Sequence, residues 1–187
     1  MARVLVPLAQ GCEELEAITV VDLLRRAGIQ VVTAGLDDLP VKGSRGSVLI
    51  PDFSLDKVST DTFDMIVLPG GLPGADNLNA DERIHRILQK MASESKYICA
   101  ICAAPRVLAA AGLLNNKKAT SFPGALDGCE LVDFTYLEEP VVIDGNIVTS
   151  RGPGTAMDFT LDLIELLEGN AVREQVEASL QRPLLHP

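Results

Sequence analysis

The chain has 187 residues and a net charge of −10, with 47% hydrophobic and 22% charged residues. This composition predicts one globular domain over residues 1–187 and excludes disordered and fibrous proteins. No apolar run reaches the roughly 18–20 residues that cross a bilayer, the N-terminus shows no signal-peptide pattern, and the negative charge disfavours nucleic acid and anionic membranes as partners.

Short apolar runs alternate with longer amphipathic segments. In chain order, we predict a strand at 3–9, a helix at 13–27, a strand at 29–36, a hairpin or edge excursion at 41–50, a strand at 64–68, a helix at 81–91, a strand at 96–101 and a helix at 104–111. Further short strands are expected near Ala119, Val132, Val141 and Ile147. A long helix begins near Thr155, which resembles a capping box with Asp158, and ends at Gly169; a short helix and a Pro-containing tail follow.

This alternation predicts an α/β fold, a doubly wound sandwich with a mostly parallel central sheet. In such sheets ligands bind beyond the carboxyl ends of the strands. The candidate site therefore lies in the loops after Ala9, Leu68 and Ile101.

Cys102 follows a predicted strand and precedes Pro105, which suits the first turn of a helix. A thiol at such a strand-to-helix elbow lies near the positive end of a helix, which lowers its pKa and favours the thiolate. The alternative is a small buried hydrophobic residue.

The other cysteines point to less chemistry. Cys99 and Cys102 have the C-x-x-C spacing of redox dithiols, but Cys99 lies inside an apolar strand and is interpreted as a core residue. Cys12 is either a resolving thiol for Cys102 or a loop cysteine without a role. Four cysteines without a secretory signal indicate a reduced protein of the cytoplasm.

Glu16 lies on the apolar stripe of the first helix, together with Val20 and Ala27. A carboxyl group there must find a hydrogen-bond partner or stay protonated. Beside a thiolate, a neutral Glu16 would donate to the sulfur, and the two groups would titrate together. A carboxyl solvated at the helix start is the alternative.

The remaining chemistry is sparse. The glycine-rich loop at 68–74 offers amides to an oxyanion but lacks the lysine and hydroxyl residue of a phosphate-binding loop. His85 is interpreted as a surface residue, and His186 lies in the tail, so neither is placed as a base for Cys102. Metal-ligand spacing is missing, and we expect no metal and no cofactor.

The ordered segments GCEELEA, DLLRRAGI, GSRG, VLPGG, AICAAP and TSRGPGT resemble the ThiJ/PfpI superfamily, and within it the DJ-one-like branch with bacterial YajL-like proteins. The resemblance covers nearly the whole chain and implies a flavodoxin-like sandwich and a homodimer. It implies that Cys102 is the oxidation-prone nucleophile and Glu16 the carboxyl bonded to its sulfur.

The same resemblance assigns further residues. The amides of Gly71 and Ala103 match the anion-binding donors, and Arg26, Arg45 and Arg151 fall in segments near the dimer contact. One departure is Phe122, which stands where several relatives have a histidine, and it weakens any mechanism that needs an imidazole.

The resemblance implies a cysteine-dependent stress protein that acts on reactive dicarbonyls such as methylglyoxal, free or as adducts of amines and thiols. The enzyme types are a glutathione-independent glyoxalase and a protein deglycase. The alternative is a redox sensor or chaperone without turnover that forms a sulfinate at Cys102. A glutamine amidotransferase shares the elbow but normally needs a histidine beside the thiol.

Overall fold

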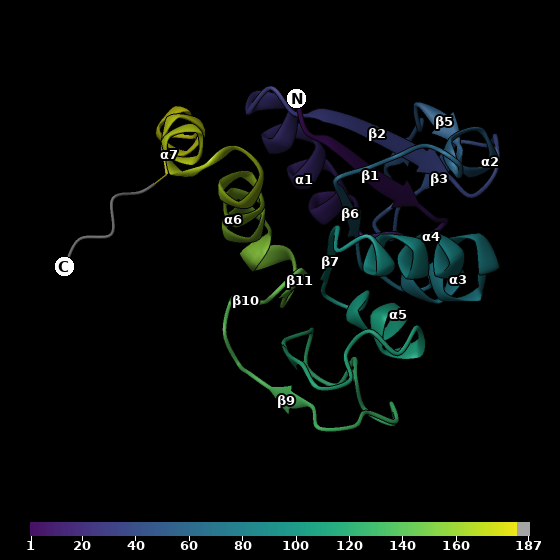
Figure 1. Cartoon of the computed structure of the whole chain (residues 1–187). Helices are drawn as coiled ribbons and strands as arrows, with labels where there is room; N and C mark the ends of the chain where they lie inside the picture. The colour runs from purple at the N-terminus through teal and green to yellow at the C-terminus, as the bar shows by residue number, and fades with distance from the viewer. Residues whose placement is uncertain (183–187) are drawn as a thin grey trace.

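The computed structural model describes residues 1–182 and shows an α/β sandwich around one seven-stranded sheet (Figure 1). The strands run in the order β10-β11-β7-β6-β1-β2-β5, and all neighbouring pairs are parallel except β10 with β11. They are β1 (Arg3–Leu8), β2 (Gln30–Gly35), β5 (Phe53–Ser54), β6 (Met65–Leu68), β7 (Tyr97–Ile101), β10 (Val141–Asp144) and β11 (Ile147–Ser150). The predicted fold class is confirmed. His186 and the end of the predicted tail lie outside the described residues.

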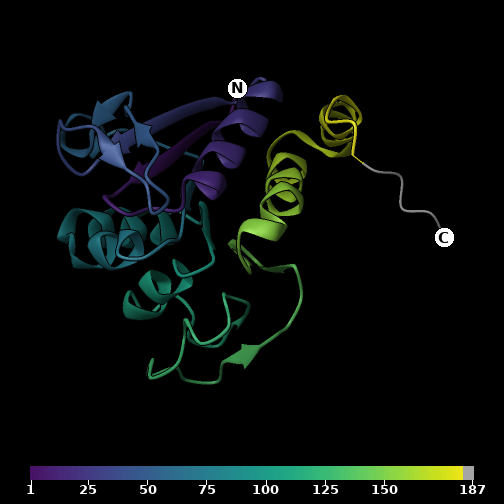
Figure 2. The same cartoon turned by 180° about the vertical axis from the view of Figure 1, so that it is seen from behind.

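Helices cover both faces of the sheet (Figures 1 and 2). One face carries α1 (Glu14–Arg26) and α6 (Ala156–Glu168), with α7 (Asn170–Ser179) packed on α6. The other face carries α2 (Leu55–Val58), α3 (Gly74–Ala80), α4 (Glu82–Ser93) and α5 (Pro105–Ala110).

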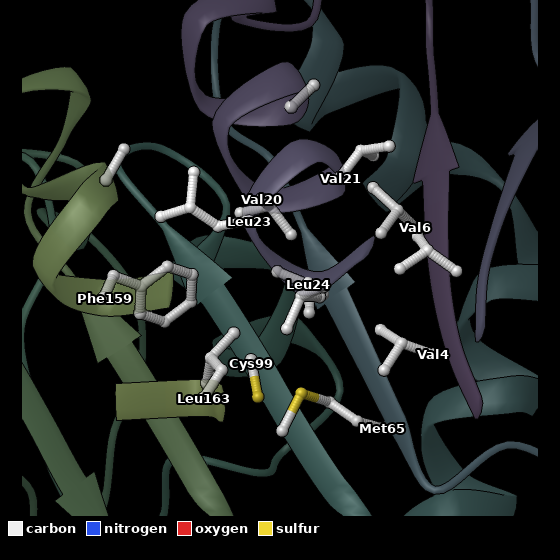
Figure 3. Close-up of a cluster of buried hydrophobic side chains, with 14 of the residues drawn as sticks. Val4, Val6, Val20, Val21, Leu23, Leu24, Met65, Cys99, Phe159 and Leu163 are labelled. Carbon is white, nitrogen blue, oxygen red and sulfur yellow. The ribbon is translucent and has the colours of Figure 1, made fainter. Parts of the chain in front are cut away.

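The strand residues alternate between two hydrophobic cores, because successive side chains of a strand point to opposite faces. Val4 and Val6 pack with α1 and α6, whereas Leu5 between them packs on the other face. Figure 3 shows Cys99 in the first core near Met65 and Leu163. Cys99 is fully buried, which confirms its interpretation as a core residue.

Two small sheets lie outside the main sheet. β3 (Val41–Lys42) and β4 (Val48–Leu49) form the predicted antiparallel hairpin. β8 (Lys118–Ala119) pairs in parallel with β9 (Thr135–Tyr136). The strand expected near Val132 is absent from the described residues, because Asn115 and Asn116 take up the backbone hydrogen bonds of Val132.

The capping box expected at Thr155 is also wrong. A short 3-10 helix, η1 (Pro153–Thr155), precedes α6. The Thr155 hydroxyl bonds back to Gly152, at 3.1 Å from the amide nitrogen and 3.0 Å from the carbonyl oxygen. Asp158 instead pairs with Arg182 at 2.7 Å.

The sheet topology determines where loops meet. From β1 the chain continues to β2 and β5 on one side, and the strands of this sheet from β6 onward are added on the other side of β1. The point between β1 and β6 is the topological switch point, where open α/β sheets form their ligand crevices. The loops after β1, β6 and β7 are therefore neighbours at the carboxyl edge.

Candidate active site

Cys102 forms a tight turn between β7 and α5. Its φ of +62° lies in the left-handed region, which residues with a side chain seldom adopt. Two backbone hydrogen bonds hold the turn: the Cys102 amide donates to the Ser150 carbonyl at 3.0 Å, and the Phe122 amide donates to the Cys102 carbonyl at 2.9 Å. The side chain is only partly buried. The predicted elbow between a strand and a helix is confirmed.

Gly70 lets the loop after β6 touch this turn. A β-carbon on Gly70 would lie 2.6 Å from the Cys102 β-carbon and 2.8 Å from the Ile101 carbonyl oxygen. Both distances are too short for any side chain. Glycine at this position is therefore a condition for the contact between the two loops.

Glu16 extends from the first turn of α1 to the same place. It is fully buried, and its Oε2 accepts a hydrogen bond of 2.8 Å from the Gly70 amide. Its Oε1 has no hydrogen-bond partner within residues 1–182, and the carboxyl lies beside the Cys102 thiol. The structure thus brings the two predicted catalytic residues together, and Glu16 is the buried stripe residue rather than a solvated one.

The two acids perturb each other. Burial raises the pKa of Glu16 from 4.5 to about 7, although the Gly70 amide and the Cys102 thiol act to lower it. Burial also raises the pKa of the Cys102 thiol, and the charge of an ionised Glu16 raises it further, to about 12. The expected low pKa is therefore wrong for a Cys102 that faces an ionised Glu16. A thiolate at neutral pH requires Glu16 to carry the proton that the pair retains.

Two backbone amides face the sulfur. The Gly71 and Ala103 amides both interact with the Cys102 side chain and act to lower the pKa of its thiol, against the effect of burial. Gly71 has a φ of +83°, and a β-carbon there would lie 2.4 Å from the Glu13 nitrogen. These are the two donors that the sequence resemblance assigns. Their position next to the sulfur suits an anion formed there.

A third segment borders the sulfur, and sequence reasoning assigned it no place at the thiol. The position of a β-carbon on Gly152 lies 4.0 Å from the Cys102 sulfur and 3.5 Å from Cδ2 of Phe122. The Thr155 hydroxyl fixes Gly152 through the two bonds described above and lies 2.7 Å from Oγ of Ser150. The apolar ring of Phe122 thus stands near the thiol. The sequence contains this G-x-x-T spacing at Gly152 and Thr155, but the pattern there predicts the start of a helix capped by Thr155 and not a turn beside the thiol.

Neither the other cysteines nor His85 is among the main causes of the pKa shift of the Cys102 thiol, although the Cys12 backbone packs against Gly71. Cys12 is fully buried, and burial raises the pKa of its thiol to about 11. Burial raises the thiol pKa of Cys99 as well. The four cysteines are free. His85 on α4 is half-buried rather than a plain surface residue, and its Nε2 lies 2.9 Å from the carbonyl oxygen of Asn79 in α3.

The three arginines expected near a dimer contact are spread over the molecule. Arg26 is in the last turn of α1, at the opposite end of that helix from Arg45, whose amide donates to Glu14 at 3.0 Å. Arg151 follows β11 and donates to the Glu138 carbonyl at 3.4 Å. Their place at a dimer contact stays a prediction.

Between residues 1 and 182, no group of three or more His, Cys, Asp or Glu side chains is arranged to hold a metal ion. Nor does this part of the chain contain a helix long and apolar enough to cross a membrane.

The fold and the site together define a class of protein: a doubly wound α/β sandwich with a cysteine at a strand-to-helix elbow and a buried glutamate beside the thiol. The chain belongs to the DJ-1/PfpI family, whose model matches residues 2–166. Protein dj-1beta of Drosophila melanogaster is 44% identical over 179 residues, which are 94% of this chain and 95% of that protein. The glutathione-independent glyoxalase DJR-1.2 of Caenorhabditis elegans is 39% identical over 90% of this chain and 89% of its own length.

Solved structures agree with this assignment. The crystal structure of Drosophila melanogaster DJ-1beta has a TM-score of 0.93 at 41% identity and covers 98% of this chain and 99% of that one. The structure of Toxoplasma gondii DJ-1, described as oxidized, has a TM-score of 0.92 at 36% identity, over 98% and 100% of the two chains. The flavodoxin-like fold is thereby confirmed.

Not every relative has the same length. Protein DJ-1 homolog A of Arabidopsis thaliana is 46% identical over 89% of this chain, and the match covers 43% of that protein. For homolog B the match covers 38%. The chain thus spans about two fifths of these two relatives.

Proposed function

We propose that this DJ-1-type stress protein acts on reactive dicarbonyls such as methylglyoxal, free or as adducts of amines and thiols. The observation that carries the proposal is the Cys102 thiol beside the buried Glu16 carboxyl, which is hydrogen-bonded to one side only. Covalent catalysis by a thiol requires a base beside the nucleophile, and a base whose pKa lies near neutral pH is the most effective.

The first step is attack of the Cys102 sulfur on the aldehyde carbon. Glu16 accepts the thiol proton as the carbon–sulfur bond forms, so the reaction needs no standing thiolate. The oxygen that gains the negative charge faces the Gly71 and Ala103 amides. Glu16 then returns the proton to this oxygen, which gives a hemithioacetal.

In the second step Glu16 removes the proton from the carbon bonded to sulfur and delivers it to the neighbouring carbonyl carbon, while the hydroxyl proton passes from the oxygen of the first carbon to the oxygen of the second. The product is a thioester of a 2-hydroxy acid. Water hydrolyses the thioester and restores the Cys102 thiol, so methylglyoxal and one water become lactate without any oxidant. A carboxyl whose pKa burial raises to about 7 can both take and give the proton near neutral pH.

The role of Glu16 explains how the site works without an imidazole. Phe122 stands near the sulfur where several relatives have a histidine, and its ring has no group that titrates. In this scheme the proton transfers to and from carbon go through one carboxyl.

The test is lactate formation from methylglyoxal by the wild type and by Cys102→Ser. We expect the variant to lose the activity, and equal rates would refute the proposal. Cys129→Ser is the matched control, because Cys129 is also a free, partly buried cysteine and takes no part in the scheme. Circular dichroism shows whether each variant is folded.

A second function, a redox sensor, is favoured by the same pair. A partly exposed thiol oxidises to sulfenic and then sulfinic acid, and a protonated Glu16 would donate a hydrogen bond to the sulfinate. Intact mass after mild peroxide should show two added oxygen atoms on Cys102, and Glu16→Gln should change the yield. Oxidation at another residue would count against this function.

The four free cysteines support a reducing compartment such as the cytoplasm. We also propose a homodimer. Leu15 and Ile18 lie one turn apart on α1 and are about half exposed, as is Met157 at the start of the adjacent α6. Light scattering after gel filtration should show a dimer, and Ile18→Asp should yield a monomer. Ile143→Asp, at an equally exposed isoleucine of β10, should stay dimeric.

A further inference from the structure

A cavity of about 410 Å³ that the proposed mechanism does not use lies under the segment 121–138. Small-molecule sites typically have about 300–1,000 Å³, so the cavity has the size of a binding site. The methyl group of methylglyoxal would leave most of it empty.

Two stretches of chain connect the cavity with the surroundings of the sulfur. Ser121 and Pro123 line it, whereas the ring of Phe122 between them is directed to Gly152. In the same way Arg151 lines the cavity, whereas the next residue, Gly152, borders the Cys102 sulfur. The contact between Phe122 and Gly152 therefore separates the reacting atom from the cavity. Phe122 is 51% exposed, so a substituent attached at the sulfur can pass over its apolar ring toward the cavity.

The lining selects for an uncharged group. Leu126, Leu131 and Phe134 supply an apolar wall, and Tyr136 adds a second aromatic ring. The charged lining residues are Asp127, Glu138 and Arg151. The net charge of these three residues is negative, which disfavours an anionic substituent.

We propose that this cavity binds the aromatic or extended apolar substituent of a 2-oxoaldehyde whose aldehyde carbon lies at the Cys102 sulfur. The chemistry at the sulfur rests on the proposed function, whereas binding of the substituent does not. Larger dicarbonyls, rather than methylglyoxal, are then the preferred substrates of the site.

The test uses thiol alkylation, which needs no turnover. Cys102 is alkylated with iodoacetamide and with N-benzyl-iodoacetamide, and both rates are divided by those of free glutathione. Cys129 lines the cavity, so Cys129→Ser, which removes this second thiol, is the reference protein. Cys129→Trp fills the cavity. As the control, Val132→Trp in the Cys129→Ser protein adds the same bulk at an exposed residue of the same segment.

We expect the reference protein to prefer the benzyl reagent about tenfold, the gain from burying about half of a phenyl ring. Cys129→Trp should abolish the preference, and Val132→Trp should keep it. Equal normalised rates for the two reagents in the reference protein would overturn the proposal.

A second measurement avoids the bulky variant. In Cys102→Ser, the unreactive N-benzylacetamide should slow alkylation of Cys129 by iodoacetamide, and no protection would count against the cavity as the binding site. Turnover of methylglyoxal and phenylglyoxal is measured in parallel. Absence of both products refutes the proposed function and leaves the alkylation result to decide on the cavity.

Discussion

Glu16→Gln keeps the size of the side chain and its acceptor for the Gly70 amide but removes the charge. Burial raises the pKa of Glu16 from 4.5 to about 7, so the folded protein binds this proton more tightly than the unfolded chain does. Stability is therefore lost as the pH rises from 4.5 to about 7, and the loss is complete above that range. At about 1.4 kcal/mol for each pH unit, the loss amounts to about 3 kcal/mol.

We expect Glu16→Gln to be about 3 kcal/mol more stable than the wild type at about pH 8, and about as stable as the wild type at about pH 4. Urea unfolding under reducing conditions, extrapolated to water at both pH values, measures the difference.

Glu14→Gln is the matched control on the same turn of α1. Burial opposes the shift, but hydrogen bonds from the backbone amides of Glu14, Arg45 and Ser47 lower the pKa of Glu14 to about 2. Its carboxylate thus contributes stability that is present above pH 4.5 and lost toward about pH 2, so Glu14→Gln should be less stable than the wild type in neutral solution. If Glu16→Gln were also less stable than the wild type in neutral solution, the reasoning that burial disfavours the Glu16 carboxylate would be refuted.

Three further predictions concern the same region and its support. Iodoacetamide should alkylate Cys102 at lower pH in Glu16→Gln than in the wild type, because the charge that raises the thiol pKa is gone; an unchanged pH profile would contradict this coupling. Gly70→Ala should cost about 1–3 kcal/mol through overpacking and slow the alkylation of Cys102, and a wild-type rate would show that the two loops need no close contact. Phe159→Ala, at a fully buried ring of α6, should cost about 3–5 kcal/mol in urea unfolding, whereas a loss below about 1 kcal/mol would mean that the core collapses around the gap.

Strong local patterns made the centre of the fold predictable. β1, β6 and β7 are continuous apolar runs, and α1 has a clear apolar stripe. Glu16 stood out because a carboxyl on such a stripe is unusual, and its burial follows from the same periodicity. β5, α2 and α3 are too short for a periodic signal and were not predicted.

Other features depend on contacts between distant segments. The thiol pKa of Cys102 is set by how closely Glu16 approaches it and how much water is excluded, and neither appears in the local sequence around Cys102. The Thr155 hydroxyl had two partners compatible with the sequence, Asp158 and Gly152, and only the backbone geometry decides between them. The cavity under 121–138 forms where a mostly irregular segment that contains β9 meets Arg151, and no periodic pattern encodes such a space.

The turn at Cys102 is held by Phe122 and Ser150, which both follow it in the chain. During synthesis, Glu16 and Cys102 leave the ribosome before the peptide groups that hold the turn. A nascent or truncated chain that ends before β11 therefore lacks the Ser150 carbonyl that accepts from the Cys102 amide. The geometry of the thiol is thus complete only when the last strand of the described sheet has been synthesised and has paired with β7.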